Sequence, residues 1–538
     1  MKLSLESLSE KNEFLKNGFI LPKFDVMRVR EKTATEPVWL HFGAGNIFRA
    51  FPAAIMQTLL DEGLADTGII ACEGFDGEIV DKAYKPFDCL SVLSTLKSSG
   101  QVEDRVIASV TEALRTDGEN ESDIRRAREI IVMPSLQMLS FTITEKGYAV
   151  KNAAGDFFPF VASDLSKSPD EAKTLMGQIC NLLWLRFDKT KLPLAVCSMD
   201  NCSHNGDKLK NGVTEMANAW REKGYFSNEF IKALADPEQY SFPLSMIDKI
   251  TPRPDKRVAE ALTKKGFEDT ETIITSRGTY TAAFVNAEET QYLVIEDLFP
   301  CGRPPLEKAS VIFTKRETVD KVEKMKVCTC LNPLHTALAI LGCLLGYTLI
   351  SEEMKDESLE KLVKELAYKE GMPVVVDPKV LSPMDFARQV IDVRLTNPFM
   401  PDAPQRIATD TSQKLPIRFG ETLKAYHSHS GLSAASLRII PFVLAAYVRY
   451  LMAIGDDGQP MAVSSDPRLA ELQEKISGIK LGGKNENLHE IVKPIYSDES
   501  LFAVDLYALG LGDKIENYLK EMLKGKGAVR AALDGLFK

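Results

Sequence analysis

The 538-residue sequence has no excess of positive charge and no long hydrophobic run. Lys plus Arg total 66 and Asp plus Glu total 76, so the net charge is −10. General nucleic-acid binding needs a basic surface that displaces counterions from phosphates, so this balance excludes it. The longest apolar stretch, residues 336–350, is shorter than the ~20 residues that span a bilayer. It predicts a buried helix, and we expect no membrane as a partner.

The sequence also lacks the cysteine pattern of a disulfide framework and the apolar core of a signal peptide. Its nine cysteines are odd in number and irregularly spaced. Charges are scattered through residues 1–15. Together these absences predict reduced thiols and a cytoplasmic location. Apolar residues at 44% and charged residues at 26% are typical of a globular chain large enough to bury its own core.

The first half of the chain alternates between strand and helix patterns. Residues 38–42 form a β-prone run that ends in Gly43-Ala44-Gly45, apolar residues at helical spacing follow through residue 60, and residues 68–72 form a second β-prone run. Further β-prone runs occur at 91–96, 106–110, 130–133, 139–144 and 194–199. This alternation predicts an α/β fold with a mainly parallel sheet covered by helices.

The pattern changes near residue 300. A Gly- and Pro-rich segment at 301–305 is typical of a linker, and helical periodicity dominates after it. We therefore expect two domains. The first, residues 1–300, carries the cofactor site and a polar N-terminal arm over residues 1–36. The second, residues 301–538, is mostly helical and carries substrate and catalytic groups. We interpret residues 351–385 as an insertion, to which the sequence assigns no role.

The glycine turn is the first candidate site. Glycines between a strand and a helix let the backbone turn sharply and approach a pyrophosphate at the helix N-terminus. The third glycine of the common G-x-G-x-x-G pattern is replaced by Phe48. Glu73 ends the second β-prone run, where an acidic side chain binds a ribose 2′-hydroxyl and repels a 2′-phosphate. This favours NAD over NADP, with Asp76 as the competing acid and a plain strand-to-helix turn as the structural alternative.

Several segments, in order along the chain, resemble the polyol-specific long-chain dehydrogenases, the mannitol dehydrogenase family. This family includes mannitol 2-dehydrogenase, fructuronate reductase (mannonate oxidoreductase) and tagaturonate reductase. The matching segments span roughly residues 38–420 and are Gly43-Ala44-Gly45-Asn46-Ile47-Phe48-Arg49, Ser140-Phe141-Thr142-Ile143-Thr144-Glu145-Lys146-Gly147-Tyr148, Ser198-Met199-Asp200-Asn201-x-x-His204-Asn205-Gly206, Met246-Ile247-Asp248-Lys249-Ile250-Thr251-Pro252, Ile295-Glu296-Asp297, Leu331-Asn332-x-x-His335 and Arg406-Ile407-Ala408-Thr409-Asp410 through Lys414-Leu415-Pro416.

The resemblance implies a Rossmann-type N-terminal domain with an extended sheet, a helical C-terminal domain and an active site in the cleft between them. It also implies NAD(P)-dependent oxidation of a secondary alcohol without a metal. A lysine can act as general acid or base, and amide NH₂ groups can stabilise an oxyanion. The resemblance assigns the cofactor to Gly43, Gly45, Asn46 and Ile47, beside the Glu73 inferred above. It assigns catalysis to Lys326, Asn201, Asn332 and His335, and substrate binding to Asp248, Arg406 and Lys414.

One spacing departs from the family pattern. The family places its lysine five residues before the asparagine, whereas Lys326 lies six before Asn332. On a straight α-helix these side chains would point apart. Either a bulge absorbs the extra residue, or Lys326 precedes a helix that starts at Pro333, with Asn332 then a simple N-cap. Lys321 and Lys324 are rival lysines, and Glu323 could relay the proton to solvent.

The sequence of the segment Leu331-Asn332-Pro333-Leu334-His335-Thr336 resembles that of the hexuronate reductases more than that of the hexitol enzymes. It implies NAD-dependent reduction of D-fructuronate to D-mannonate by a monomer or small homo-oligomer. The cations Lys249, Arg406, Lys414 and Arg418 could pair with the substrate carboxylate. Tagaturonate reduction and mannitol 2-dehydrogenation are the alternatives within the family. An epimerase or hydrolase that recycles bound NAD, or a non-catalytic cofactor sensor, are alternatives of another class. A zinc site is disfavoured, because the cysteine spacings differ from those of structural zinc sites.

Overall fold

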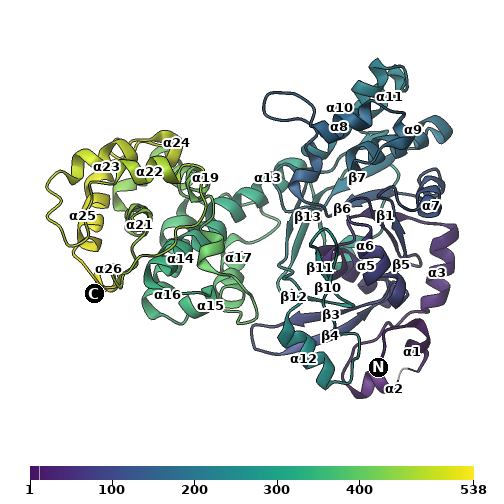
Figure 1. The fold of residues 1–538 in the computed structure, drawn as a ribbon, viewed down its shortest axis with the longest axis horizontal. Helices are drawn as coiled ribbons and strands as arrows, with labels where there is room; N and C mark the ends of the chain where they lie inside the picture. Colours follow the sequence, from purple (N-terminus) through teal and green to yellow (C-terminus); the bar gives the residue numbers. More distant parts are fainter. Residues whose placement is uncertain (11) are drawn as a thin grey trace. The chain divides into compact units, whose positions relative to one another are not determined.

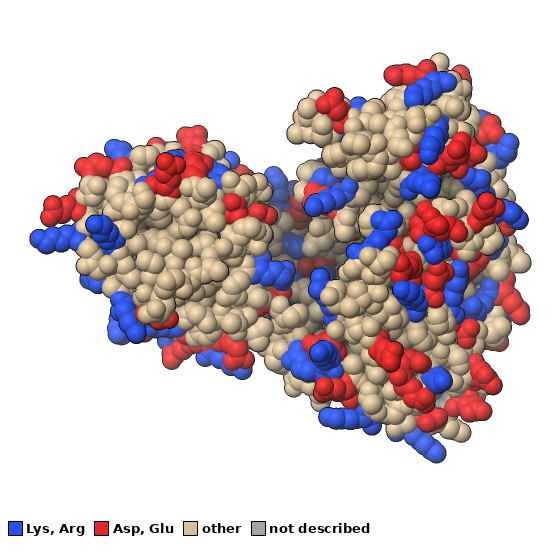
Figure 2. Space-filling model, in the orientation of Figure 1, with Lys and Arg blue, Asp and Glu red and all other residues tan. Residues whose placement is uncertain are grey.

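The computed structural model describes residues 1–10 and 12–538 and divides the chain into two compact units. The first comprises Met1–Lys97 and Gln101–Val319, and the second comprises Ser98–Gly100 and Asp320–Lys538. The boundary between the units, at Val319 and Asp320, lies later than the predicted domain boundary at residue 300. On the face drawn in Figure 2, acidic and basic residues are interspersed over each unit, which accords with a net charge of only −10.

The first unit is built on a six-stranded parallel sheet, which confirms the predicted Rossmann-type fold (Figure 1). Alternate residues of the first strand face opposite sides, so Trp39 joins one hydrophobic core and Leu40 the other. Helices cover both faces of the sheet, so successive residues of each strand are apolar instead of alternating with polar ones. The strand order is β5 (Val110–Arg115), β2 (Ile69–Glu73), β1 (Trp39–Phe42), β6 (Met138–Phe141), β7 (Leu194–Ser198) and β8 (Tyr240–Ser241).

Helices form a layer on each side of this sheet. One core contains residues of α4 (Asn46–Ala50), α5 (Pro52–Asp61) and α6 (Glu78–Ala83). The other contains residues of α7 (Glu121–Ile131), α9 (Leu175–Thr190), α10 (Asn205–Glu222) and α11 (Asn228–Ala235). The strand predicted at residues 130–133 is wrong. Its β-branched residues Ile130 and Ile131 form the last turn of α7, where they fill this second core.

Further short strands extend the first unit. One three-stranded sheet has the order β12 (Phe284–Glu288), β3 (Ser91–Leu96), β4 (Val102–Ile107), and another has the order β14 (Ile312–Thr314), β13 (Tyr292–Glu296), β9 (Ser245–Asp248). A two-stranded hairpin pairs β10 (Ile273–Ile274) with β11 (Tyr280–Thr281). The expected polar arm contains helices, α1 (Leu5–Ser9), α2 (Asn12–Lys16) and α3 (Val26–Thr35), and two more helices are α8 (Pro159–Leu165) and α12 (Lys256–Lys264).

The second unit is helical, as predicted (Figure 1). Its central helices are α14 (Asn332–Leu345) and α21 (Ile439–Leu451), which pack together and are almost entirely buried. The helical run Arg316–Leu345 is long and apolar enough to cross a membrane by length and composition alone, yet 78% of its most apolar window is buried inside the fold, which is typical of a core helix.

The connecting helix α13 (Arg316–Met325) begins in the first unit and ends in the second. The remaining α-helices of the second unit are α15 (Ile350–Glu353), α16 (Glu357–Glu365), α17 (Pro383–Gln389), α18 (Pro404–Ile407), α19 (Thr411–Leu415), α20 (Glu421–Ser428), α22 (Leu469–Lys475), α23 (Leu488–Tyr496), α24 (Glu499–Phe502), α25 (Gly512–Met522) and α26 (Ala528–Gly535). π-Helical turns interrupt them at η5 (Lys326–Cys330), η6 (Leu366–Gly371), η8 (Val390–Arg394) and η9 (Pro416–Gly420).

Candidate active site

The glycine turn joins β1 to α4 in the first unit. Gly43 has φ +102°, and a Cβ atom at this position would lie 2.2 Å from the Thr142 carbonyl oxygen, so only glycine fits. Gly45 is the N-cap of α4, and a Cβ atom there would meet nothing within 4 Å. One glycine therefore permits the turn, and the other leaves open space in front of the helix.

The predicted cofactor residue Asn46 takes part in a network that ties α4 to the hairpin strand β11. Its amide donates to the Tyr280 carbonyl at 3.3 Å, and its Oδ1 accepts from the buried Arg49 guanidinium at 2.9 Å. Arg49 also donates to Thr281 Oγ1 at 2.7 Å and to the Ala282 carbonyl at 2.6 Å. These contacts fix the helix that follows the turn, and the neighbouring Ile47 packs against the core.

Glu73, at the end of β2, is bonded directly to the glycine turn. Its Oε2 accepts from the Ala44 amide at 2.9 Å, and its Oε1 accepts from the amides of Phe75 and Asp76 at 2.9 and 3.1 Å. Burial raises the pKa of this carboxyl, and the three amide donors oppose that rise. The rival Asp76 instead accepts from the hydroxyls of Thr275 and Thr279 in the β10–β11 loop. Of the two acids, Glu73 is the one that contacts the glycine turn.

In the second unit, Lys326 begins the π-helix η5, and the Leu331 amide donates to its carbonyl at 3.1 Å. This wide turn takes in one extra residue, so Asn332 lies where residue 331 would lie on an uninterrupted α-helix. Of the two alternatives for this spacing, the structure therefore has the bulge, although Pro333 favoured the other. The alternative of Asn332 as an N-cap is wrong, because Leu331 occupies the N-cap and Asn332 is the first residue of α14.

The three candidate lysines differ in their exposure to solvent. Lys326 is 5% exposed, whereas Lys321 and Lys324 are exposed on α13. A lysine that exchanges a proton with a substrate must be sheltered with that substrate, so Lys326 is the better-placed candidate.

His335 lies one turn after Asn332 on α14. Its Nε2 is buried and has no hydrogen-bond partner among residues 1–10 and 12–538, although Asp402 Oδ2 lies 3.9 Å away. Burial lowers the pKa of His335 to about 4; the Asp402 carboxylate opposes this, and the charges of Arg394, Arg418 and Arg406 reinforce it. The imidazole is therefore neutral at pH 7 and can exchange a hydrogen bond with a substrate hydroxyl.

The charges of Arg394, Arg406 and Arg418 act on His335. Arg418, on η9, donates to Thr336 Oγ1 at 2.6 Å, and burial lowers its pKa to about 10. Lys414 donates to the carbonyls of Ile407 and Thr409, and burial, followed by the charge of Arg418, lowers its pKa to about 8. Arg394, which sequence analysis missed, is 2% exposed. The side chain of the predicted substrate residue Arg406 is 66% exposed and pairs with Asp402. We name Arg394, Arg406, Lys414 and Arg418 the cation cluster.

Asn201 and Asp248 belong to the first unit, and the proposed cleft between the units stays a prediction. Asp248 ends β9 and is 4% exposed. Lys249, predicted to pair with a carboxylate, donates to the Glu288 carbonyl at 2.9 Å and to Gln291 Oε1 at 2.8 Å. The exposed His204 has left-handed backbone geometry before α10, as suits the turn interpretation. Among the described residues, no group of three or more His, Cys, Asp or Glu is placed to hold a metal.

Two family models account for most of the chain. The mannitol dehydrogenase Rossmann domain matches residues 38–308, and the mannitol dehydrogenase C-terminal domain matches residues 318–522. The chain belongs to the mannitol dehydrogenase family. It is therefore an oxidoreductase that acts on a CH–OH group, as predicted, and its Rossmann domain indicates a nicotinamide cofactor.

Individual members of the mannitol dehydrogenase family agree in length with this chain. D-mannonate oxidoreductase of Thermotoga maritima is 50% identical over 536 residues, covering 99% of this chain and 98% of that protein. D-mannonate oxidoreductase of Escherichia coli K12 is 29% identical, covering 87% and 89%. A crystal structure of D-sorbitol dehydrogenase aligns with TM-score 0.78 at 25% identity, covering 96% and 97%. Mannitol 2-dehydrogenase of Pseudomonas fluorescens, in complex with NAD and D-mannitol, shares the fold with TM-score 0.70.

Other residues of the family motifs, outside the predicted site, form buried hydrogen bonds that connect segments of the first unit. Asn205, in the motif that contains Asn201, donates from its buried amide to the Asp200 carbonyl and to Ser245. The Asp200 carboxylate accepts from the Ile143 amide at 2.8 Å and from the Tyr148 hydroxyl, and burial raises its pKa to about 7. Sequence analysis missed these positioning roles, although the motif residues themselves were visible.

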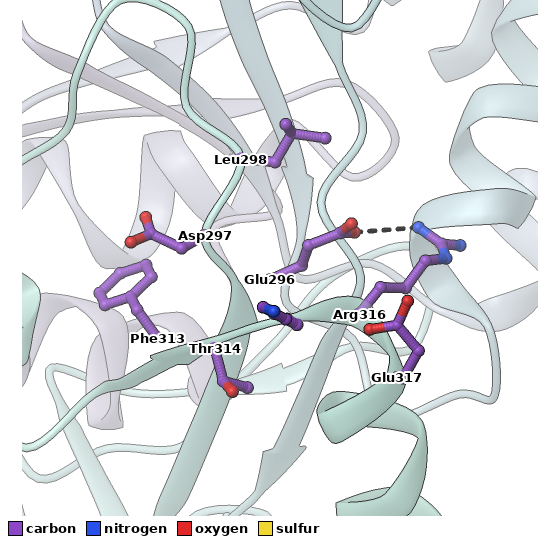
Figure 3. A pocket seen from close by; sticks show the side chains of 8 residues that line it. Glu296, Asp297, Leu298, Phe313, Thr314, Arg316 and Glu317 are labelled. Carbon is purple, nitrogen blue, oxygen red and sulfur yellow. Dashed lines mark hydrogen bonds and ion pairs between the residues drawn. The ribbon is translucent and has the colours of Figure 1, made fainter.

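The family segment Ile295-Glu296-Asp297 supports the connecting helix. Glu296 accepts from the Leu244 amide at 3.0 Å and from Arg316 at 2.9 Å, the pair marked in Figure 3. Arg316 also donates to Asp207 at 2.6 Å. These ion pairs fix the first turn of α13, the helix that leads to Lys326. The Glu296–Arg316 pair also borders a cavity of about 480 Å³.

Proposed function

We propose that the chain reduces D-fructuronate to D-mannonate with NADH. The observation that carries the proposal is the cation cluster near His335, because D-fructuronate carries a carboxylate where D-fructose carries a hydroxymethyl group. Lys414 and Arg418 are both desolvated beside each other, whereas Arg406 is largely exposed and pairs with Asp402. Desolvated cations side by side are costly, and a bound anion would offset that cost. The 50% identical relative that is named D-mannonate oxidoreductase supports the same substrate.

The proposed chemistry assigns one task to each group. NADH, when bound, supplies the hydride. The glycine turn at Gly43 and Gly45, with Asn46 and Ile47, would hold the pyrophosphate, and the open space before α4 fits that role. Glu73 would lie at the adenosine ribose, where its carboxylate disfavours the 2′-phosphate of NADPH.

At the substrate, Lys326 would donate the proton to the carbonyl oxygen as hydride arrives at carbon. The amides of Asn201 and Asn332 would stabilise the developing negative charge. Neutral His335 would orient a hydroxyl through its unpartnered Nε2, while Arg406, Lys414 and Arg418 would hold the carboxylate and Asp248 would accept from a hydroxyl. No metal takes part in this scheme.

A cofactor-consumption assay tests the proposal. NADH absorbance is followed with D-fructuronate, D-tagaturonate and D-fructose, and the fructuronate reaction is repeated with NADPH. We expect the highest kcat/KM with D-fructuronate and NADH, and stoichiometric formation of D-mannonate. Faster turnover of tagaturonate or fructose would assign the chain to those reactions, and sugar conversion without net NADH loss would indicate a recycling enzyme.

We also infer a cytoplasmic location, with a sugar acid as the small-molecule partner. All nine cysteines are free thiols, and most are buried. Burial raises the pKa of Cys197, Cys328 and Cys330, which makes these thiols poor nucleophiles and poor metal ligands. Reduced, unreactive thiols are typical of a cytoplasmic enzyme.

A further inference from the structure

Asp402, in the segment before α18, lies close to His335 and was not among the site residues predicted from the sequence. Its carboxylate uses its two oxygens differently. Oδ1 accepts a hydrogen bond from the Arg406 guanidinium, whereas Oδ2 lies 3.9 Å from His335 Nε2, which is too far for a hydrogen bond. The side chains of His335 and Asp402 are 14% and 9% exposed, so the two groups are mostly sheltered from water but not sealed from it.

Backbone contacts hold Asp402 beside the helix that carries His335. The Ile350 amide donates to the Asp402 carbonyl at 2.9 Å, and the Gln405 side-chain amide donates to the Tyr347 carbonyl at 2.9 Å. Tyr347 follows the C-cap of α14, and Ile350 begins α15. The distance between the carboxylate and the imidazole is therefore set by contacts within the second unit.

The gap between these two groups has the dimensions of one hydroxyl oxygen. Buried polar atoms are nearly always paired in folded proteins, yet His335 Nε2 has no partner among residues 1–10 and 12–538. An oxygen atom at ordinary hydrogen-bond distances from both Nε2 and Asp402 Oδ2 would make an angle of roughly 90° between them. A hydroxyl group suits this position, because it accepts one hydrogen bond and donates another.

The charges around the pair determine which group donates. Burial and three nearby arginines keep the imidazole of His335 neutral at pH 7, so the ring carries one proton. The Asp402 carboxylate favours that proton on Nε2, the ring nitrogen nearer to it. A hydroxyl in the gap then accepts from Nε2–H and donates to Asp402 Oδ2.

We propose that Asp402 is a further substrate-binding residue, and that Asp402 and His335 together bind one hydroxyl group of the sugar chain. Arg406 fixes the carboxylate through Oδ1, and a guanidinium has five N–H groups, so it keeps donors for a substrate carboxylate. Such a pair is selective, because an analogue without the hydroxyl leaves two sheltered polar groups unpaired. The proposal rests on the proposed function only in taking a polyhydroxy ketone, or the alcohol formed from it, as the substrate.

Kinetics with monodeoxy analogues test the proposal. The parent ketose is whichever of D-fructuronate, D-tagaturonate and D-fructose has the highest kcat/KM. Asp402→Asn keeps the shape of the side chain and replaces one acceptor oxygen by an amide donor. This variant should lower kcat/KM for the parent ketose about 10²-fold. With the wild-type protein, one analogue should also lose about 10²-fold, whereas with Asp402→Asn the same analogue should lose less than about threefold relative to the parent. The other analogues should lose equal factors with both proteins.

Controls separate recognition of a hydroxyl from damage to the fold. Asp402→Asn should keep the thermal midpoint and the NADH affinity of the wild-type protein, and Asp402→Ala repeats the test if the Asn variant melts early. Asp392→Asn removes the same charge from an exposed position of the second unit and should respond to every analogue as the wild-type protein does.

Two results would overturn the proposal. One is an Asp402→Asn variant with the wild-type kcat/KM for the parent ketose. The other is a variant whose losses match those of the wild-type protein for every analogue. Failure of the fructuronate assay would change only the parent ketose and would leave this test intact.

Discussion

The two units form their sites in different ways. In the first unit, the candidate cofactor groups follow the ends of regular parallel strands, and backbone amides fix their positions, as when Glu73 accepts from Ala44, Phe75 and Asp76. In the second unit, Lys326, Arg394 and Arg418 all lie on π-helical turns. π-Turns are rare and frequently mark functional sites. The candidate dinucleotide site is thus made from regular elements, whereas the residues proposed for catalysis and anion binding lie on irregular helices.

The largest expected effect concerns the π-turn of the second unit. Lys326→Ala should lower kcat about 10²–10⁴-fold, because it removes the proposed proton donor, while NADH affinity stays at the wild-type value. The exposed Lys324→Ala is the matched control and should keep near-normal turnover. Steady-state kinetics with D-fructuronate and NADH titration measure both effects. Loss of activity in the Lys324 variant alone would move the acid/base role to that residue.

Two glycine variants test the first unit. Gly43→Ala forces a Cβ against the Thr142 carbonyl at positive φ and should lower the thermal midpoint and NADH affinity together. Gly45→Ala meets no protein atom, so it should leave the thermal midpoint unchanged and raise the Kd for NADH by about tenfold or more. Thermal melts and NADH titrations of both variants provide the comparison. A stable Gly43→Ala variant with normal affinity would contradict the account of the turn.

The contrast also explains how much the sequence alone could predict. The parallel sheet and the glycine turn were predictable, since alternating apolar runs and Gly43 reflect local backbone demands. The π-turn was visible only as a six-residue spacing between Lys326 and Asn332, because i→i+5 bonding leaves no residue signature. Arg394 was missed, since its place near His335 arises from tertiary packing. Ile130 and Ile131 were misassigned because a β-branched pair in a buried helical turn looks like a strand.

The pH dependence of substrate binding provides a smaller effect. Lys414 has its pKa lowered to about 8, so it is charged below that pH and loses its charge above it. Carboxylate binding should therefore weaken as the pH rises through about 8, and KM for D-fructuronate should increase several-fold between pH 7 and 9. Lys414→Met should have a higher KM at pH 7 and a flatter profile. An unchanged pH profile in this variant would exclude Lys414 from carboxylate binding.

The smallest expected effect is on stability and lies away from the site. Glu353 is fully buried, neither of its carboxyl oxygens has a hydrogen-bond partner among the described residues, and burial raises its pKa well above the ordinary value. The folded state therefore holds it neutral, and stability is lost as pH rises above the unfolded-state pKa. Glu353→Met should raise the free energy of unfolding by about 1–2 kcal/mol, more at pH 8 than at pH 5. Urea unfolding measures this, with the exposed Glu352→Met as control.

The most direct test of the central claim compares two substrates on one variant. The cation cluster is proposed to bind the substrate carboxylate. Arg418→Met should therefore lower kcat/KM for D-fructuronate about 10²-fold, because the variant loses a charge-assisted hydrogen bond in a buried site. The same variant should change kcat/KM for D-fructose, which has no carboxylate, less than about threefold, and Arg418→Lys should recover part of the loss. Equal losses on both substrates would contradict the claim that this cluster selects a sugar acid.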